Sequence, residues 1–385
     1  MKLSGNIPLV MTKKQKLLQI IESNRFPFSD IAKHYAVVFD ESRYEVVDLY
    51  LSGSDRGLFV NGDKLLHRTL MWGLEDQSSE AHGLRFFYRL VSLLRIEQFD
   101  VVICHDTKTL YSLSLARRFL RRFELVGVVY NIAQASKKLQ QMFLMINKDK
   151  VLLLTASDQL KHRILKTFPY IPADRVQTCY PGLDFKRFKS DLFKKVEARD
   201  HLHLDQNDFL FANVEQVESV ENRTTLLKSF ALLSKVCPNA KLVFMGSEHW
   251  QQSISIQARQ LFIDDKLFFH DTHALADVYL KAFDAIIWTS DKQDFNLSLL
   301  ASMASGVPIV AATGSGATSE ILGNTASLFK ENDVYQLAYQ IQKIYELSLD
   351  ERQNLKKYMY SHLKHHFSAR ACRKKFWSSA AAKSL

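Results

Sequence analysis

The sequence lacks several features that would assign it to common classes. Its four cysteines stand far apart without a Cys-x-x-Cys pair, so neither a zinc site nor a disulfide framework is indicated. No run of eighteen apolar residues occurs, which disfavours a membrane-spanning helix. Residues 1–16 lack the apolar core of a signal peptide. We therefore expect a cytoplasmic protein with reduced cysteines, of which Cys104 beside His105 is the candidate for a reactive role.

Other signatures are absent as well. No internal repeat with a period of about 20 to 50 residues and no long low-complexity tract is visible in the sequence. Paired carboxylates spaced to hold a metal are also missing. We therefore expect neither a bound metal nor a resident cofactor.

Basic residues are in excess and clustered. The formal net charge is +10, and the clusters contain Arg117, Arg118, Arg121 and Arg122, then Lys186, Arg187, Lys194 and Lys195, then Arg370, Arg373, Lys374 and Lys375. Such clusters attract anionic partners such as lipid headgroups or lipid-linked acceptors, although a solvated surface explains them equally well. Nucleic acid is disfavoured, because the aromatic residues lie mostly in apolar runs rather than among the basic ones.

The length and the apolar content suit two domains. A chain of 385 residues with 47% hydrophobic residues is too long for one ordinary core and can bury two. In the first half, strands are predicted at 44–50, 99–104, 125–130 and 151–154, and helices at 86–94 and 109–122. Strands that alternate with helices indicate a parallel, Rossmann-like sheet.

The second half repeats this alternation. We predict strands at 209–214, 241–245 and 266–269, with a helix at 222–233. A strand at 285–288, a helix at 296–305 and a strand at 309–312 then form a βαβ unit. Gly306 ends this helix and Pro308 prevents it from continuing. Because the helix begins at the carboxyl end of a strand, its first N–H groups near Asn296 are expected to bind an anion such as a pyrophosphate.

The segment 288–322 resembles the C-terminal signature of retaining glycosyltransferases of the GT-B fold, family 4 type. That signature is usually Ser-x-x-Glu-Gly-Phe, an apolar stretch, Glu-Ala-Met, Gly-x-Pro and Gly-Gly-x-x-Glu. The positions that match are Ser290, Phe295, Leu297, Met303, Gly306, Pro308, Gly316 and Glu320. The segments 153–165 and 179–188 also resemble this family, and Ser157 would cap the helix in the first of them.

The resemblance implies an α/β protein of GT-B fold, with two Rossmann-like domains whose parallel sheets face each other across a cleft. We expect an acceptor-side domain at 1–190, a nucleotide-sugar-binding domain at 205–365, and a C-terminal helix at 366–385 that returns to the first domain. In this last segment Phe367, Ala371 and Phe376 would form the apolar face.

Several charges that the family uses are missing. The two glutamates that hold the donor sugar and its ribose correspond to Gln293 and Ala301, and the phosphate-binding Arg and Lys correspond to Gln216 and Glu221. Cations normally stabilise the charge that develops on the leaving diphosphate. Arg223 is the best substitute in the sequence.

The N-terminal site also departs from the family. Where the family has a Gly-Gly-x-Glu loop, this chain has residues 24–30, in which Arg25 could contact a phosphate or the acceptor and Asp30 could cap a helix. His105 follows a predicted strand, at a position where family members often have a His near the sugar. A structural role for His105 is as well supported as a functional one. His270 and His273 lie in a loop that adjoins the nucleotide base in the family.

The resemblance implies a metal-independent hexosyltransferase-like enzyme that uses a nucleotide-diphosphate sugar. The acceptor would be a glycan or a lipid-linked precursor, as in lipopolysaccharide or polysaccharide biosynthesis, and the protein could lie on the inner face of the membrane. The catalytic candidates are His105 and Gln293; the donor-binding candidates are Gln216, Arg223, Gly246, Ser290, Asp294, Phe295, Asn296, Leu297 and Glu320. The alternative is a catalytically degenerate GT-B protein that acts as a scaffold or binds glycan.

Overall fold

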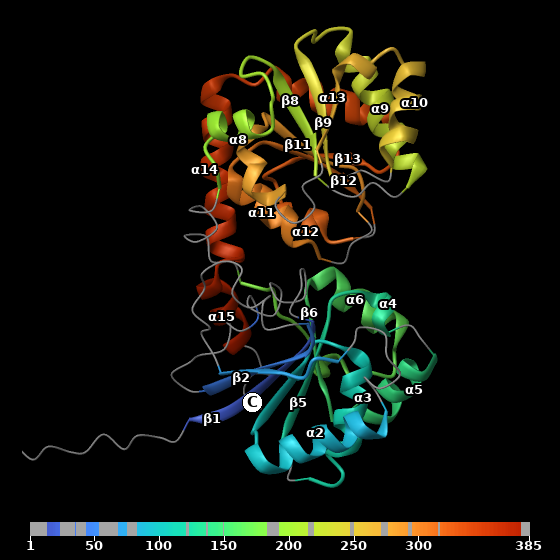
Figure 1. Ribbon diagram of the computed structural model, residues 1–385, viewed down its shortest axis with the longest axis vertical. Coiled ribbons are helices and arrows are strands. Elements are labelled where there is room, and N and C mark those ends of the chain that lie inside the picture. The colour runs from blue at the N-terminus through green and yellow to red at the C-terminus, as the bar shows by residue number, and fades with distance from the viewer. Residues whose placement is uncertain are drawn as a thin grey trace, which may run out of the picture.

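The structure is a computed structural model. It describes residues 14–23, 35, 44–53, 68–74, 83–120, 123–135, 138–148, 150–182, 192–214, 219–246, 250–270, 276–291, 295–314 and 316–378. Two parallel sheets, each covered by helices, form two Rossmann-like domains (Figure 1). The predicted fold class is therefore confirmed.

The N-terminal sheet has seven parallel strands in the order β3-β2-β1-β4-β5-β6-β7. Their bounds are β1 Gln15–Ser23, β2 Tyr44–Ser52, β3 Arg68–Met71, β4 Val101–Cys104, β5 Glu124–Val129, β6 Leu152–Thr155 and β7 Val176–Thr178. The central strand β1 is not among the strands predicted from the sequence. Its alternate residues enter different cores, with Leu17 on one face and Leu18 and Ile20 on the other.

Helices cover one face of this sheet with a shared apolar core. They are α2 Leu84–Glu97, α3 Thr107–Ala116, α4 Ile132–Ala135, α5 Lys138–Asn147 and α6 Asp158–Thr167, with the short helix η3 Ala173–Arg175 before β7. Helix α3 ends before the predicted Arg122. Its buried face stops at Ala116, and Phe119 is 76% exposed, so no packing favours a longer helix.

The C-terminal sheet has six parallel strands in the order β10-β9-β8-β11-β12-β13. They are β8 Phe209–Asn213, β9 Ala240–Met245, β10 Leu267–His270, β11 Ala285–Trp288, β12 Ile309–Thr313 and β13 Ser327–Lys330. The strand order reverses between β8 and β11. In open α/β sheets such a reversal marks the crevice where ligands bind.

Helices lie on both faces of the second sheet. They are α8 Lys195–His201, α9 Val220–Ser234, α10 Gln251–Gln260, η5 Asp264–Lys266, η6 Ala276–Ala282, α11 Leu297–Ser305, α12 Thr318–Leu322, α13 Val334–Tyr345 and α14 Leu349–His366, and α14 is followed by α15 Ala369–Trp377. Gly306 ends α11 in the left-handed conformation (φ 76°), as the sequence predicts.

The C-terminal helices join the two domains. Helix α14 runs along the second domain and α15 lies beside the N-terminal sheet (Figure 1). Phe367, Cys372 and Phe376 are buried in a core that also contains residues of both sheets. Trp377 stacks on Tyr44 of β2 with ring centroids 5.9 Å apart. A Cβ on Gly182 would approach the Cα of Ala369 to 2.7 Å, so the glycine permits close contact between the backbones.

Helix α8 is anchored to the second domain by a buried arginine. Arg199 is fully buried; its guanidinium donates to Asp284 Oδ2 at 2.7 Å and to the carbonyl oxygens of Ala282, Asp205, Gln206 and Asp208. The same carboxylate accepts a hydrogen bond from Lys195, whose side chain is 48% exposed. A buried charge whose three nitrogens all have hydrogen-bond partners is stable only while these partners remain.

We predict that Arg199→Met lowers the free energy of unfolding by about 3 kcal/mol, because it removes the buried cationic partner of Asp284 and the donor to several carbonyl groups. The matched control is Lys195→Met, which removes an exposed partner of the same carboxylate and should cost less than about 1 kcal/mol. Urea unfolding followed by fluorescence measures both. Equal effects of the two substitutions would contradict this account.

Candidate functional site

The carboxyl edges of the two sheets face each other. Helix α6 begins directly after β6, and α12 follows the carboxyl end of β12. The Glu320 side chain of α12 accepts hydrogen bonds from the backbone N–H groups of Asp158 and Gln159, at 2.7 and 2.8 Å. The loops that follow both sets of strands therefore meet between the domains, where a GT-B ligand site would lie.

One predicted site residue, Ser290, follows β11 at the point where the strand order reverses. Ser290 is half-buried and Asp291 is buried directly after this strand. Gln293, Asp294, Gln216 and Arg25 lie outside the described residues, as does His273. Ser290 thus lies at the carboxyl edge of the C-terminal sheet.

The side chain of Asn296, the residue that precedes α11, caps the N-terminus of this helix. Asn296 Oδ1 accepts from Ser298 N at 2.9 Å and from Leu299 N at 3.3 Å. Phe295 and Leu297 are half-buried against the core. The N–H groups of Ser298 and Leu299 are therefore already bonded within the helix cap. An anion would meet the N–H groups of Asn296 and Leu297.

Acidic residues that the sequence analysis missed gather at the same edge. Asp291 accepts hydrogen bonds from Gly314 N at 2.6 Å and Thr318 N at 3.0 Å. Glu331 Oε1 accepts from the Asn222 side chain at 3.4 Å, and its Oε2 lies 3.3 Å from where a Gly314 Cβ would be. An acid directly after a buried strand was the available signal for Asp291. These carboxylates make the edge more negative than a diphosphate site usually is.

The remaining donor-side candidates are engaged within the domain. The Arg223 guanidinium lies 4.3 Å from the centroid of the Trp250 ring, and the residue is 5% exposed. Burial lowers the pKa of Arg223, which the nearby Glu221 opposes. Gly246 has a φ of 78° and donates its N–H to the His270 carbonyl at 2.8 Å. The Arg223 guanidinium is thus positioned by the Trp250 ring.

Polar atoms without partners lie at the ends of β8, β10 and β11. Among the described residues, Asn213 Oδ1, His270 Nε2 and Trp288 Nε1 are buried and have no hydrogen-bond partner. Burial lowers the pKa of His270 as well. Unpaired buried polar atoms are unfavourable and are concentrated at functional sites. Their positions at three strand ends agree with a ligand site at this edge.

His105 lies at the matching edge of the N-terminal sheet. The residue follows β4, is 3% exposed and stacks on Tyr130, whose hydroxyl is hydrogen-bonded to its Nδ1. Burial lowers the pKa of His105 to about 3 and raises the pKa of Tyr130. The imidazole is therefore neutral, and if Tyr130 donates to Nδ1 the ring proton is on Nε2. In the described part of the chain, Nε2 has no partner.

The cysteines are buried thiols. Cys104, Cys179, Cys237 and Cys372 are all outside disulfides and buried. Burial raises the pKa of each of the four. Since the thiolate is the reactive form, the geometry gives Cys104 no nucleophilic role.

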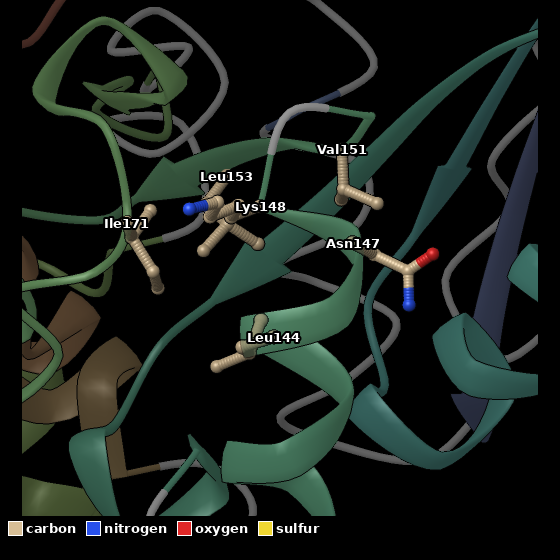
Figure 2. A pocket seen from close by; sticks show the side chains of 6 residues that line it. All are labelled: Leu144, Asn147, Lys148, Val151, Leu153 and Ile171. Carbon is tan, nitrogen blue, oxygen red and sulfur yellow. The ribbon is translucent and has the colours of Figure 1, made fainter.

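A small hollow lies at the opposite, amino edge of the first sheet (Figure 2). It is lined by Leu144, Asn147, Lys148, Val151, Leu153 and Ile171, which come from the end of α5, the start of β6 and the turn after α6. The Asn147 side chain is already paired with Ser114 and with the Phe143 carbonyl. We assign no ligand to this mostly apolar hollow.

Metal clusters and membrane spans are both missing from the described ranges. In these ranges, no three His, Cys, Asp or Glu side chains are grouped to hold a metal ion. Nor does any helix in them combine the length and the apolar character needed to cross a bilayer.

Comparison with known families gives a match in the second half of the chain. Residues 194–362 match the family model described as glycosyl transferases group 1. This range contains every strand of the C-terminal sheet and most of the helices around it.

Two curated relatives are similar in sequence. An uncharacterised glycosyltransferase of Methanocaldococcus jannaschii is 23% identical over 246 residues, which cover 59% of this chain and 60% of that protein. Alpha-monoglucosyldiacylglycerol synthase of Streptococcus pneumoniae is 27% identical over 135 residues, or 34% of this chain and 31% of that protein. The matches thus span less than two thirds of the length of these relatives.

A solved structure matches almost the whole chain. HepE of Anabaena in complex with UDP and glucose superposes with a TM-score of 0.75 at 15% identity, covering 96% of this chain and all of that one. At this identity the likeness shows the fold, which is GT-B.

We predict that His105 makes the protein less stable in acid. The unfolded chain binds a proton below its ordinary pKa of 6.5, whereas the folded His105 does so only near pH 3. The free energy of unfolding should therefore fall by up to about 1.4 kcal/mol per pH unit as the pH drops from 6.5 towards 3, and this contribution should be complete above pH 6.5. His105→Gln should show a shallower slope in urea unfolding between pH 7 and 5. Parallel slopes would contradict the burial of a neutral ring.

Proposed function

We propose that this chain is a metal-independent glycosyltransferase, and the premise is the match of residues 194–362 to the family model described as glycosyl transferases group 1. It would move a sugar from a nucleoside diphosphate to an acceptor. The observation that carries the proposal is that the carboxyl edges of the two sheets face each other. The edge of the C-terminal sheet carries the N-terminus of α11, and the edge of the N-terminal sheet carries the buried, neutral His105.

The donor would bind at the edge of the C-terminal sheet. Its diphosphate would meet the N–H groups of Asn296 and Leu297, where the helix dipole favours negative charge. Ser290, Gly246 and Phe295 would border the nucleotide, and we propose Gln216, Gln293 and Asp294 as further donor contacts. Arg223 would be the cation that meets the phosphates. Anabaena HepE, which shares the fold, was solved in complex with UDP, and this supports UDP as the first nucleotide to test.

His105 would act on the transferred sugar from the N-terminal side. A neutral ring whose Nδ1 is held by Tyr130 presents Nε2 as the group that meets a ligand. Such a ring hydrogen-bonds to a sugar hydroxyl without adding charge, and Gln293 would contact the same sugar from the opposite domain. Arg25 would contact a phosphate or the acceptor.

The acceptor would be a glycan or a lipid-linked precursor, as in polysaccharide or lipopolysaccharide biosynthesis. One support is helix α2, on which Leu84 and Tyr88 are 89% and 76% exposed beside exposed Arg85 and Arg89. The two apolar residues are one helical turn apart, as are the two arginines, and such a surface suits contact with a membrane that contains anionic lipids. The protein would then lie peripherally on that membrane.

A second candidate is a catalytically degenerate protein that serves as a scaffold or binds glycan. It is favoured by the missing charges at Gln216, Glu221, Gln293 and Ala301, and by the acids Asp291 and Glu331 at the donor edge. Ala301 is buried in α11, so a glutamate there would need hydrogen-bond partners inside the protein.

A panel of nucleotide sugars tests the proposal. We expect at least one UDP-, GDP- or ADP-sugar to stabilise the protein by about 2.7 kcal/mol at a hundred times its dissociation constant, seen as a rise in the melting temperature. Release of the nucleotide in the presence of glycan or lipid-linked acceptors would identify the enzyme. Binding without release would favour the scaffold, and silence across the panel would reject the donor site.

A substitution at the helix cap tests where the diphosphate binds. Asn296→Asp keeps an oxygen that caps α11 but adds a negative charge beside the phosphates, so it should weaken nucleotide binding by about 1 to 3 kcal/mol. Asn296→Ser is the matched control, because it caps the helix without charge and should keep the affinity. Calorimetric titration measures both. Equal affinities would place the diphosphate elsewhere.

A further inference from the structure

The contact between the domains contains a shared helix cap. Glu320 Oε1 accepts from Asp158 N, and Oε2 accepts from Gln159 N. These are the first two residues of α6, and the N–H of the third, Leu160, is bonded to the Ser157 hydroxyl at 3.1 Å. The first turn of α6 is thus satisfied only with a carboxylate from the other domain.

The Tyr180 side chain of the N-terminal domain also binds the Glu320 carboxylate. The Tyr180 hydroxyl lies 2.5 Å from Glu320 Oε1 and 3.0 Å from Asp158 Oδ2. Burial, together with the hydrogen bond to Glu320, raises the pKa of Tyr180, so the phenol remains a donor. The Lys375 ammonium of α15 lies 4.2 Å from the centroid of the Tyr180 ring. The contact therefore sits where α15 returns to the first domain.

Helix α12 is also fixed at its first residue. Asp291, directly after β11, accepts the N–H of Thr318, the first residue of α12. A path of hydrogen bonds thus leads from the donor edge through Asp291 and α12 to Glu320 and α6. Charge-assisted bonds of this kind are stronger than neutral ones.

We propose that Glu320 is a positioning residue, an interdomain clasp that holds the two carboxyl edges together through the N-terminus of α6. While the clasp is closed, both oxygens of Glu320 accept hydrogen bonds from the N-terminal domain, so the role that the structure gives this side chain is to join the domains. The contact itself does not depend on the proposed function. Only its purpose does, which is to position the donor against the acceptor-side domain.

The test compares three variants in the protein without ligand. Glu320→Gln exchanges an acceptor oxygen for a donor group, and Tyr180→Phe removes the hydroxyl that bridges the two carboxylates. Asp333→Asn is the matched control, because Asp333 caps α13 through Gln336 N at 2.9 Å within the second domain. Amide hydrogen exchange of residues 156–161 reports the cap, and small-angle X-ray scattering reports the separation of the domains.

We expect Glu320→Gln to raise amide exchange at Asp158 and Gln159 by at least about tenfold and to increase the radius of gyration. Tyr180→Phe should change both in the same direction by less, and Asp333→Asn should change neither. Unchanged exchange would overturn the clasp, and so would faster exchange with unchanged scattering, which would make Glu320 a local cap only. If Glu320→Gln does not fold, Tyr180→Phe decides by the same criteria.

Titration with UDP separates the clasp from a donor contact. Unchanged UDP affinity in a loosened Glu320→Gln protein supports the clasp. If Glu320→Gln loses affinity for UDP while its amide exchange and its scattering equal those of the wild type, the clasp is overturned and Glu320 contacts the donor. If the wild type binds no UDP, the proposed function is affected, but the clasp is still decided by the measurements without ligand.

Discussion

The return of the C-terminal helices to the first domain is the interaction on which the rest of the structure depends. Phe367, Cys372 and Phe376 are buried in a core that contains residues of both sheets, and burial of each aromatic side chain contributes about 1.5 to 3 kcal/mol. Because this packing fixes the two sheets relative to each other, their carboxyl edges face one another. The ligand loops and the Glu320 contact follow from that arrangement.

The electrostatics of the donor edge depart from what a diphosphate usually meets. Asp291 and Glu331 flank Gly314, while Arg223 lies on the Trp250 ring. Asp291 is neutralised in part by the two N–H groups that it accepts, so it serves the structure of α12. Binding of an anion here would depend on helix N–H groups more than on cations.

The two histidine sites show how burial decides chemistry. His105 and His270 both lie at the ends of strands and both have an Nε2 without a partner among the described residues, and burial lowers the pKa of each. Neutral rings at strand ends supply directional hydrogen bonds without charge. This suits a site that already contains acids and would receive an anionic donor.

The sequence by itself determined the alternation of strands and helices, the βαβ unit around Asn296, the end of α11 at Gly306 and the cap at Ser157, because periodicity and capping are local properties. It did not reveal β1, whose central place comes from pairing with β2 and β4. The tertiary structure alone decided the partners of Glu320, Asp291 and Arg223. The sequence does not distinguish a carboxylate that binds a ligand from one that caps a helix of another domain. Asp158 of α6 and Glu320 of α12 are 162 residues apart in the chain, and only the packing of the domains brings them into contact.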